Sequence, residues 1–420
     1  MYLKIASLVV VRGAGALFSL AAALGVTQLY GNAEGAGFFF HYSLTMVIAY
    51  LMRVGCDNGI IKFCSQDVGG ESYYRLSLVV AASIGGAAFA IYFLLHGLLL
   101  GRMHRDDSVA IVLGASLFVS LLQVNGRYMQ AQRWGGCAAV LQSSLLSMVM
   151  SFFLLVFYIL DVENNWGGAS ELLLGSASLS CLVSFACVKF IAGADLSVRL
   201  PDKGIRLELY EWFRRTSTFF FTGLVNMLTQ WGGQIFVGAS FPGADVVTVS
   251  VGQRISNTLN LLLAATNIYV APRVSRLYEA DRFEDIADMV NRITRALLLI
   301  SIISFVFVFV FGKYILGIFG VEGKVAFVCL ILLYAGQCIN VSTGNVALVL
   351  NFSGHERHMK ICAIVGLMVG GVLLLVSSMT GSVVIASAAI SCAVIVQNLI
   401  ARRKVRRIFE EWKGLGSRRA

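Results

Sequence analysis

Three arginines lie within long apolar stretches of the sequence and are the residues best placed there to do chemistry. They are Arg12, Arg53 and Arg254. A charge in hydrocarbon costs roughly 2.5–3.5 kcal/mol on insertion scales, so such residues normally face a cavity or a charged partner. The planar guanidinium group can hold phosphate oxygens through two parallel hydrogen bonds. We therefore expect these arginines to bind an anionic substrate, although Arg12 and Arg53 are also near enough to a helix end to reach the membrane interface.

Asp57 is the acidic residue that lies clearly inside an apolar stretch. It follows Arg53 by four residues, and this spacing allows an ion pair on one face of a helix. Two roles stay open for Asp57, namely neutralising Arg53 or coupling substrate movement to an ion. Proteins that exchange organic cations for protons are expected to bury more carboxylates than this. The balance of buried charge thus favours an anion.

Neutral amides form a second group of candidate binding residues, and helical spacing places several of them on common faces. Gln253, Asn257 and Asn260 follow the pattern i, i+4, i+7, and Gln337, Asn340 and Gly344 follow the pattern i, i+3, i+7. Asn226, Gln230 and Gln234 are spaced at i, i+4, i+8. Amides both donate and accept hydrogen bonds, which suits sugar hydroxyls. The alternative is that they only hold helices together, an interaction worth about 0.6–2 kcal/mol per contact.

Cysteine and histidine give no sign of a metal site. The nine cysteines are scattered singly, and the five histidines have no metal-like spacing. We expect no disulfide, no metal, no cofactor and no catalytic residue.

The elements that position these side chains must be membrane helices. Of the 420 residues, 58% are hydrophobic and 13% are charged, whereas soluble domains carry about 25% charged residues. A spanning helix needs roughly 20 apolar residues. The sequence predicts an all-α integral membrane protein with about twelve such spans, at residues 6–30, 37–61, 76–100, 108–126, 137–160, 168–191, 216–240, 246–270, 295–319, 325–350, 361–378 and 382–400.

The net charge of +10 is unevenly distributed along the chain. Most of the 33 lysines and arginines fall in the termini and in every second connecting segment. Positive residues collect on the cytoplasmic side of membrane proteins. This pattern predicts a multi-pass protein with both termini in the cytoplasm, and it removes the case for nucleic-acid binding.

A hydrophilic segment divides the spans into two sets of six. We expect an N-terminal six-helix lobe at residues 1–192, a cytoplasmic connector at 193–215, a C-terminal six-helix lobe at 216–400 and a basic cytoplasmic tail at 401–420. Similar turns, at residues 29–35 and 237–245, follow the first and the seventh span. Because each set has an even number of spans, the repeats would be parallel, and two such lobes would enclose a central cavity.

The first hairpin and its repeat carry a resemblance to a known family. Leu29-Tyr30-Gly31-Asn32-Ala33-Glu34-Gly35, then Val54-Gly55-Cys56-Asp57-Asn58-Gly59-Ile60-Ile61-Lys62, and later Ala271-Pro272-Arg273-Val274 resemble the pattern of Wzx-type polysaccharide (O-antigen) flippases. These belong to the multidrug/oligosaccharidyl-lipid/polysaccharide exporter superfamily. The resemblance extends over essentially the whole chain.

This resemblance implies a function in polysaccharide biosynthesis. It implies that an undecaprenyl-pyrophosphate-linked oligosaccharide moves from the cytoplasmic to the periplasmic leaflet of the bacterial inner membrane by alternating access. It also implies a cationic cavity formed by Arg12, Arg53 and Arg254. Such a role would involve membrane lipids, a polysaccharide polymerase and a chain-length regulator as partners in the membrane.

Two other functions stay open. One is a drug or metabolite exporter of the same fold, which the shortage of buried carboxylates disfavours for cationic drugs. The other is a membrane glycan-modifying enzyme, which would need a catalytic residue in a sizeable outer loop. The outer loops here are short, so we expect no enzyme activity.

Overall fold

The computed structural model describes residues 2–64, 70–99, 107–160, 168–193, 205–280, 282–352 and 355–419. In these ranges the chain is helical, without strands. It divides into two compact units, here called the N-terminal unit (Val10–Trp231) and the C-terminal unit (Gly232–Ala420, together with Met1–Val9). The predicted lobe limits at 193–215 stay a prediction.

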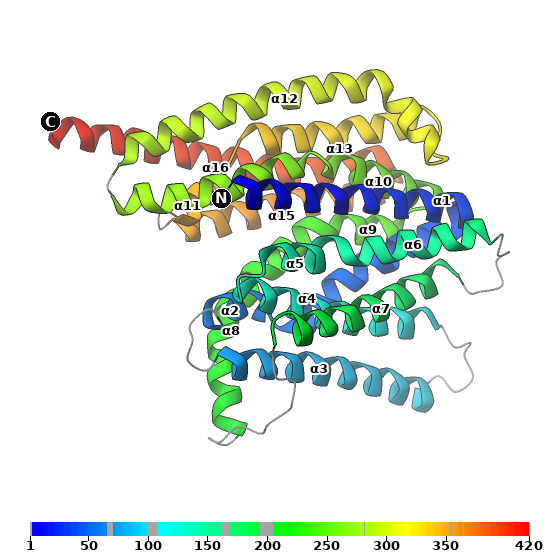
Figure 1. Cartoon of the computed structure of the whole chain (residues 1–420). Coiled ribbons are helices and arrows are strands. Elements are labelled where there is room, and N and C mark those ends of the chain that lie inside the picture. Colours follow the sequence, from blue (N-terminus) through cyan, green and yellow to red (C-terminus); the bar gives the residue numbers. More distant parts are fainter. Residues whose placement is uncertain are drawn as a thin grey trace. The chain divides into compact units, whose positions relative to one another are not determined.

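The N-terminal unit contains eight α-helices and two π turns among its described residues (Figure 1). They are α1 (Tyr2–Arg53), α2 (Cys56–Cys64), α3 (Gly70–Leu99), α4 (Asp107–Ala131), α5 (Gly135–Ala139), the π turn η1 (Val140–Ser144), α6 (Leu145–Ile159), α7 (Ala169–Phe190), α8 (Ile205–Met227) and the π turn η2 (Leu228–Gly232).

Helix α1 is two spans joined at a break. Gly31 has φ 71° and ψ −172°, which interrupts the helix inside the predicted turn. Figure 1 shows the blue helix reversing its direction there. The first predicted span therefore corresponds to the first arm of α1, and the second, 37–61, covers the second arm and continues into α2.

Helix α4 lies at the centre of the N-terminal unit and packs against α2, α3 and α7. In its most apolar window 56% of the residues are buried, compared with 17% in α3. A helix with so little exposed surface positions its side chains against other helices rather than against lipid.

The C-terminal unit contains the other eight helices of the described residues. They are α9 (Gly233–Ser240), α10 (Gly243–Asn257), α11 (Asn260–Glu279), α12 (Phe283–Ile318), α13 (Lys324–Ser342), α14 (Val346–Phe352), α15 (Glu356–Thr380) and α16 (Val383–Arg419). Helix α13 packs against α10, α12 and α16, and α15 lies along α16. The long helix α12 is 17% buried in its most apolar window and exposes Leu299, Ile303 and Phe307, as a lipid-facing helix does.

Nine helices in the described residues are long and apolar enough to cross a membrane. The first of them, Val10–Arg53, holds both arms of α1. The predicted spans 216–240 and 246–270 are not among the nine, because each is interrupted and polar. The π turn η2 separates α8 from α9, and a turn with i→i+3 hydrogen bonds at Thr258 and Leu259 separates α10 from α11. These interrupted helices carry most of the predicted substrate-binding amides.

Candidate functional site

The predicted ion pair forms in the N-terminal unit. Arg53 Nη1 donates to Asp57 Oδ1 at 3.0 Å, and Arg53 Nε donates to the carbonyl of Ala49 at 3.1 Å. Both residues of the pair are buried, with 4% and 8% of their surface exposed. The pair does not lie on one continuous helix as expected, because α1 ends at Arg53 and α2 begins at Cys56. It closes the joint between the two helices.

Backbone conformation makes this joint unusual. Val54 has φ 50° and Gly55 has φ 73°. A β-branched residue at positive φ is a strained outlier, and such outliers gather at functional sites. A Cβ on Gly55 would lie 2.6 Å from the Cα of Phe220 in α8, so this position requires glycine. Tyr50 ties α1 to the same segment by donating to the Phe220 carbonyl at 2.9 Å.

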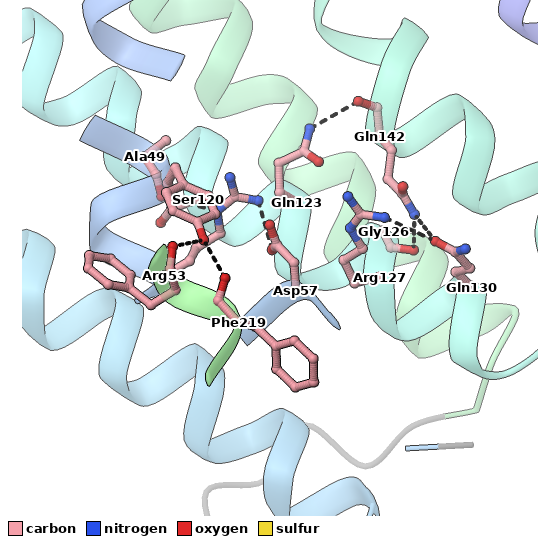
Figure 2. Close-up of polar contacts among 12 residues, drawn as sticks. Ala49, Arg53, Asp57, Ser120, Gln123, Gly126, Arg127, Gln130, Gln142 and Phe219 are labelled. Carbon is pink, nitrogen blue, oxygen red and sulfur yellow. Dashed lines mark hydrogen bonds and ion pairs between the residues drawn. The ribbon is translucent and has the colours of Figure 1, made fainter. Parts of the chain in front are cut away.

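One face of α4 adds a third guanidinium and a chain of amides (Figure 2). Gln123 donates to the carbonyl of Gln142 in η1 at 3.0 Å. Gln142 in turn donates to the carbonyl of Gly126 at 2.9 Å and to Gln130 Oε1 at 3.0 Å. Arg127 Nη1 also donates to Gln130 Oε1, at 3.3 Å. The π turn η1 therefore directs Gln142 back onto the face of α4 that carries Arg127.

Arg127 creates an excess of positive charge. It interacts electrostatically with Asp57, Arg53 and Arg12, and in Figure 2 the Asp57 carboxylate lies between Arg53 and Arg127. Three guanidiniums thus share one carboxylate among these groups. The Nε of Arg127 is buried, and no described residue accepts a hydrogen bond from it. We name Arg12, Arg53, Asp57 and Arg127 the cationic cluster.

The first arm of α1 contacts the π turn. Ser144 Oγ in η1 donates to the Val11 carbonyl at 3.2 Å, next to Arg12. Arg12 itself is exposed. A cluster with more guanidinium than carboxylate, an orphan N–H donor and an exposed arginine can hold an anion such as a phosphate group.

Arg127 is not among the predicted site residues, because the fourth predicted span ends at residue 126 and leaves Arg127 in a cytoplasmic loop. Helix α4 instead continues to Ala131. The signal was present in the sequence: Gln123, Arg127 and Gln130 have the same i, i+4, i+7 spacing as the amides of the C-terminal half.

The predicted amides of the C-terminal unit bind one another. Asn260 donates to Asn257 Oδ1 at 3.3 Å, and Asn340 donates to Asn260 Oδ1 and to Gln337 Oε1, both at 3.0 Å. We call these four residues the carboxamide network. The faces predicted on the eighth and tenth spans therefore meet.

Gln253 lies on the same helix as Asn257 but in a different setting. It is 9% exposed and lines a small hollow together with Ser256, Gln337 and Ser391. The hollow brings residues of α10, α13 and α16 together, so Gln253 contributes to helix packing at this point.

The three amides predicted to share one face of the seventh span do not have the same surroundings. Asn226 and Gln230 are exposed, whereas Gln234 is buried and donates to Ser250 Oγ at 2.7 Å. A π turn takes up about one residue more than an α turn. Since η2 lies between these residues, Gln234 does not share the exposure of the other two.

Arg254 lies half-buried in the last turn of α10. It interacts with other groups of the protein, so it is not an isolated charge. Among the described residues, no group of three or more histidine, cysteine or acidic side chains could hold a metal ion.

Comparison with known proteins identifies the architecture. The MatE family model matches residues 220–372. An inward-facing multidrug resistance MATE family transporter of the MOP superfamily matches with a TM-score of 0.68 and 14% identity, over 97% of this chain and 99% of that one. A MOP superfamily transporter from Pyrococcus furiosus, described as having a binding pocket of reversed polarity, matches with a TM-score of 0.65 and 14% identity, over 97% and 96% of the two chains.

A mutant form of a MATE transporter from Vibrio cholerae matches with a TM-score of 0.55 and 14% identity, over 96% of each chain. No curated protein sequence matches the chain. The chain is therefore a multi-pass membrane protein with the two-lobe fold of the MATE transporters in the MOP superfamily.

Proposed function

We propose that the protein is a transporter that moves an undecaprenyl-pyrophosphate-linked oligosaccharide across the bacterial inner membrane by alternating access. The observation that carries the proposal is the cationic cluster of the N-terminal unit. Fold likeness supports the transport step, and the chemistry of the cluster supports the class of substrate.

The anion follows from the charge balance. A buried charge without compensation is costly, and the buried Arg53 and the partly buried Arg127 share the single carboxylate of Asp57, while the exposed Arg12 adds to the positive charge. A pyrophosphate group would neutralise this excess and accept a hydrogen bond from Arg127 Nε. Arg53 is already satisfied by Asp57 and Ala49, so Arg127 and the exposed Arg12 are the cations best placed for first contact.

The sugar contacts are proposed on different grounds. Asn226 and Gln230 are exposed amides, as a glycan-binding surface requires. Gln253, Asn257 and Asn260 are less accessible, and Asn257 and Asn260 already use amide groups in the carboxamide network. Arg254 remains a proposed phosphate-binding residue. The lipid tails would stay in the bilayer during the movement of the head group.

Export of drugs or metabolites is the second candidate function. It is favoured by the likeness of the fold to that of a multidrug resistance MATE family transporter. The cationic cluster opposes it for cationic drugs, because a positive site repels a positive substrate. An anionic metabolite would satisfy the cluster as well as a pyrophosphate would.

Deleting the gene and analysing the lipid-linked sugars of the cell tests the proposal. We expect an undecaprenyl-pyrophosphate-linked oligosaccharide to accumulate on the cytoplasmic side, and surface glycan to be restored by the wild-type gene. Unchanged lipid-linked sugars, combined with sensitivity to a small toxic compound, would instead establish the exporter.

The proposed topology has both termini in the cytoplasm. Reporters fused after Lys62 and Arg295 should then be cytoplasmic, and those after Glu34 and Asp245 periplasmic. A polysaccharide polymerase and a chain-length regulator are the proposed membrane partners, and no catalytic step is part of the proposal.

A further inference from the structure

Helix α16 is longer than a membrane is thick. It has 37 residues, so at about 1.5 Å per residue it extends roughly 55 Å, against a hydrocarbon core of about 30 Å. Its last turns therefore lie beyond the hydrocarbon. They include residues 401–412 of the predicted basic tail.

These turns are seated firmly on the C-terminal unit. Ala401, Val405, Ile408 and Trp412 form a buried stripe with the spacing of one helical face. The stripe packs against apolar residues of α11, α12, α14 and α15. The Trp412 ring stacks on Phe283 with a centroid distance of 4.9 Å. The extension of α16 thus has a fixed orientation, and residues on its opposite side are exposed.

That opposite side is basic, and neighbouring helices extend it. The exposed basic residues nearest the apolar parts of these helices are Arg402, Arg403, Arg406 and Arg407 on α16, Arg292 and Arg295 on α12, and Arg357 and Lys360 on α15. We call them the basic belt.

Acidic residues at the same end of the unit lie on helical turns that are farther from the membrane than the basic belt. Exposed Glu284, Asp285 and Asp288 precede Arg292 on α12, and exposed Glu410 and Glu411 follow Arg407 on α16. On both helices, the basic residues lie between the acidic residues and the membrane-spanning part. Positive charge is therefore concentrated next to the membrane, whereas the more distant turns carry five exposed acidic residues against the exposed Arg276 and Arg282.

We propose that the basic belt binds the anionic headgroups of membrane phospholipids, such as phosphatidylglycerol. Lysine and arginine residues near the bilayer surface attract acidic lipids, and the attraction decays within a Debye length of about 8–10 Å. A soluble acidic partner would meet the acidic turns first, which disfavours such a partner. Because the apolar stripe packs against the C-terminal unit, the extension of α16 keeps its orientation. Its arginines can therefore stay level with the lipid headgroups while the stripe remains packed. This binding is independent of the transported substrate.

Lipid selectivity of the reconstituted full-length protein tests the proposal. The probe is spin-labelled phosphatidylglycerol, compared with spin-labelled phosphatidylcholine, in liposomes of phosphatidylcholine. The measured quantity is the relative association constant of the two lipids with the protein. The variant is Arg403→Gln with Arg406→Gln and Arg407→Gln. Arg402 stays, because it donates to the Ser342 carbonyl at 3.4 Å.

We expect the wild-type protein to prefer phosphatidylglycerol. In the triple variant, the association constant of phosphatidylglycerol relative to phosphatidylcholine should be at least about threefold lower. The matched control is Arg282→Gln, an exposed arginine on the distant side that pairs with Asp285 at 2.6 Å. It should keep the wild-type preference. A triple variant as selective as wild type, or a control that loses as much, would overturn the proposal and leave these arginines a role in membrane insertion only.

Salt dependence of the wild-type protein gives a second test that needs no variant. Raising the salt from about 0.05 M to about 1 M shortens the Debye length to about 3 Å and should reduce the preference toward unity. A preference that salt does not change would contradict the proposal, because it would show recognition by something other than exposed charge.

Discussion

The cationic cluster of the N-terminal unit and the carboxamide network of the C-terminal unit are both polar groups inside membrane helices, yet they differ in how completely they are satisfied. In the network, Asn257, Asn260, Asn340 and Gln337 pair donors with acceptors, all of them neutral. In the cluster, positive charge exceeds negative charge, and the Arg127 Nε has no described acceptor. A satisfied network stabilises helix packing, whereas an unbalanced cluster is suited to a ligand that completes it.

The joint between α1 and α2 differs from both. It combines an ion pair, a strained valine and a glycine at positive φ with no room for a Cβ atom. Strain of this kind persists only where the surroundings hold it. We therefore interpret the joint as the rigid support of the cationic cluster. Mutations can separate these three roles: support by the joint, anion binding by the cluster and helix packing by the network. We expect their effects to decrease in that order.

Breaking the ion pair should have the largest effect on stability. Asp57→Asn leaves the buried Arg53 charge without its partner, which costs about 3–5 kcal/mol. The double change Arg53→Gln with Asp57→Asn should be milder, because no charge is left alone. Thermal unfolding in detergent measures both proteins. A stable Asp57→Asn protein that does not transport would instead indicate that Asp57 couples transport to an ion.

Adding one methyl group at the joint should have the next largest effect. Gly55→Ala combines a residue at positive φ, about 1–2 kcal/mol, with overpacking against Phe220, about 1–3 kcal/mol. The control is Gly37→Ala in the second arm of α1, where a Cβ would meet nothing within 4 Å. Unfolding temperatures of the two variants should differ clearly. Equal temperatures would show that the joint adapts and is not a rigid support.

Removing Arg127 should affect function without affecting folding. Arg127→Gln removes the burial cost of the guanidinium and, together, its attraction to Asp57 and its repulsion from Arg53 and Arg12, but it also removes an anion ligand worth about 1.5–3 kcal/mol, or roughly 10- to 150-fold. Glycan export normalised to protein level measures the effect, and Arg127→Lys should be intermediate because it keeps the charge without the planar fork. Arg133→Gln, at an exposed position just after α4, is the control and should export normally.

Breaking the carboxamide network should have the smallest effect. Asn340→Ala removes the donor to Asn260 and Gln337 and should lower stability by about 0.6–2 kcal/mol. Export should fall only as far as the amount of folded protein falls. Loss of export with unchanged stability would show that the network binds sugar instead of only stabilising helix packing.

Much of the fold could be predicted from the sequence, because apolar stretches of about 20 residues dictate spanning helices. Gly31 lies inside the predicted turn, and Arg53 pairs with Asp57 as the spacing indicated. The interruptions at Leu228–Gly232 and Thr258–Leu259 could not be predicted, since π turns and tightened turns depend on packing rather than on hydropathy.

The candidate site was predicted only in part for the same reason. Hydropathy ended the fourth span before Arg127, although the helix continues for another turn. The contacts of Gln142 with Gly126 and Gln130 require η1, which no local pattern indicates. Residues that act through an irregular turn are difficult to find from periodicity alone.

Direct binding of pyrophosphate is the measurement closest to the central claim. Isothermal titration calorimetry of inorganic pyrophosphate with the purified full-length protein needs neither a known glycan nor a transport assay. We predict binding to wild type, at least about tenfold weaker binding to Arg127→Gln, and binding within about twofold of wild type for Asn340→Ala. Equal binding by wild type and Arg127→Gln, or loss of binding in Asn340→Ala alone, would contradict the assignment of the anion to the cationic cluster.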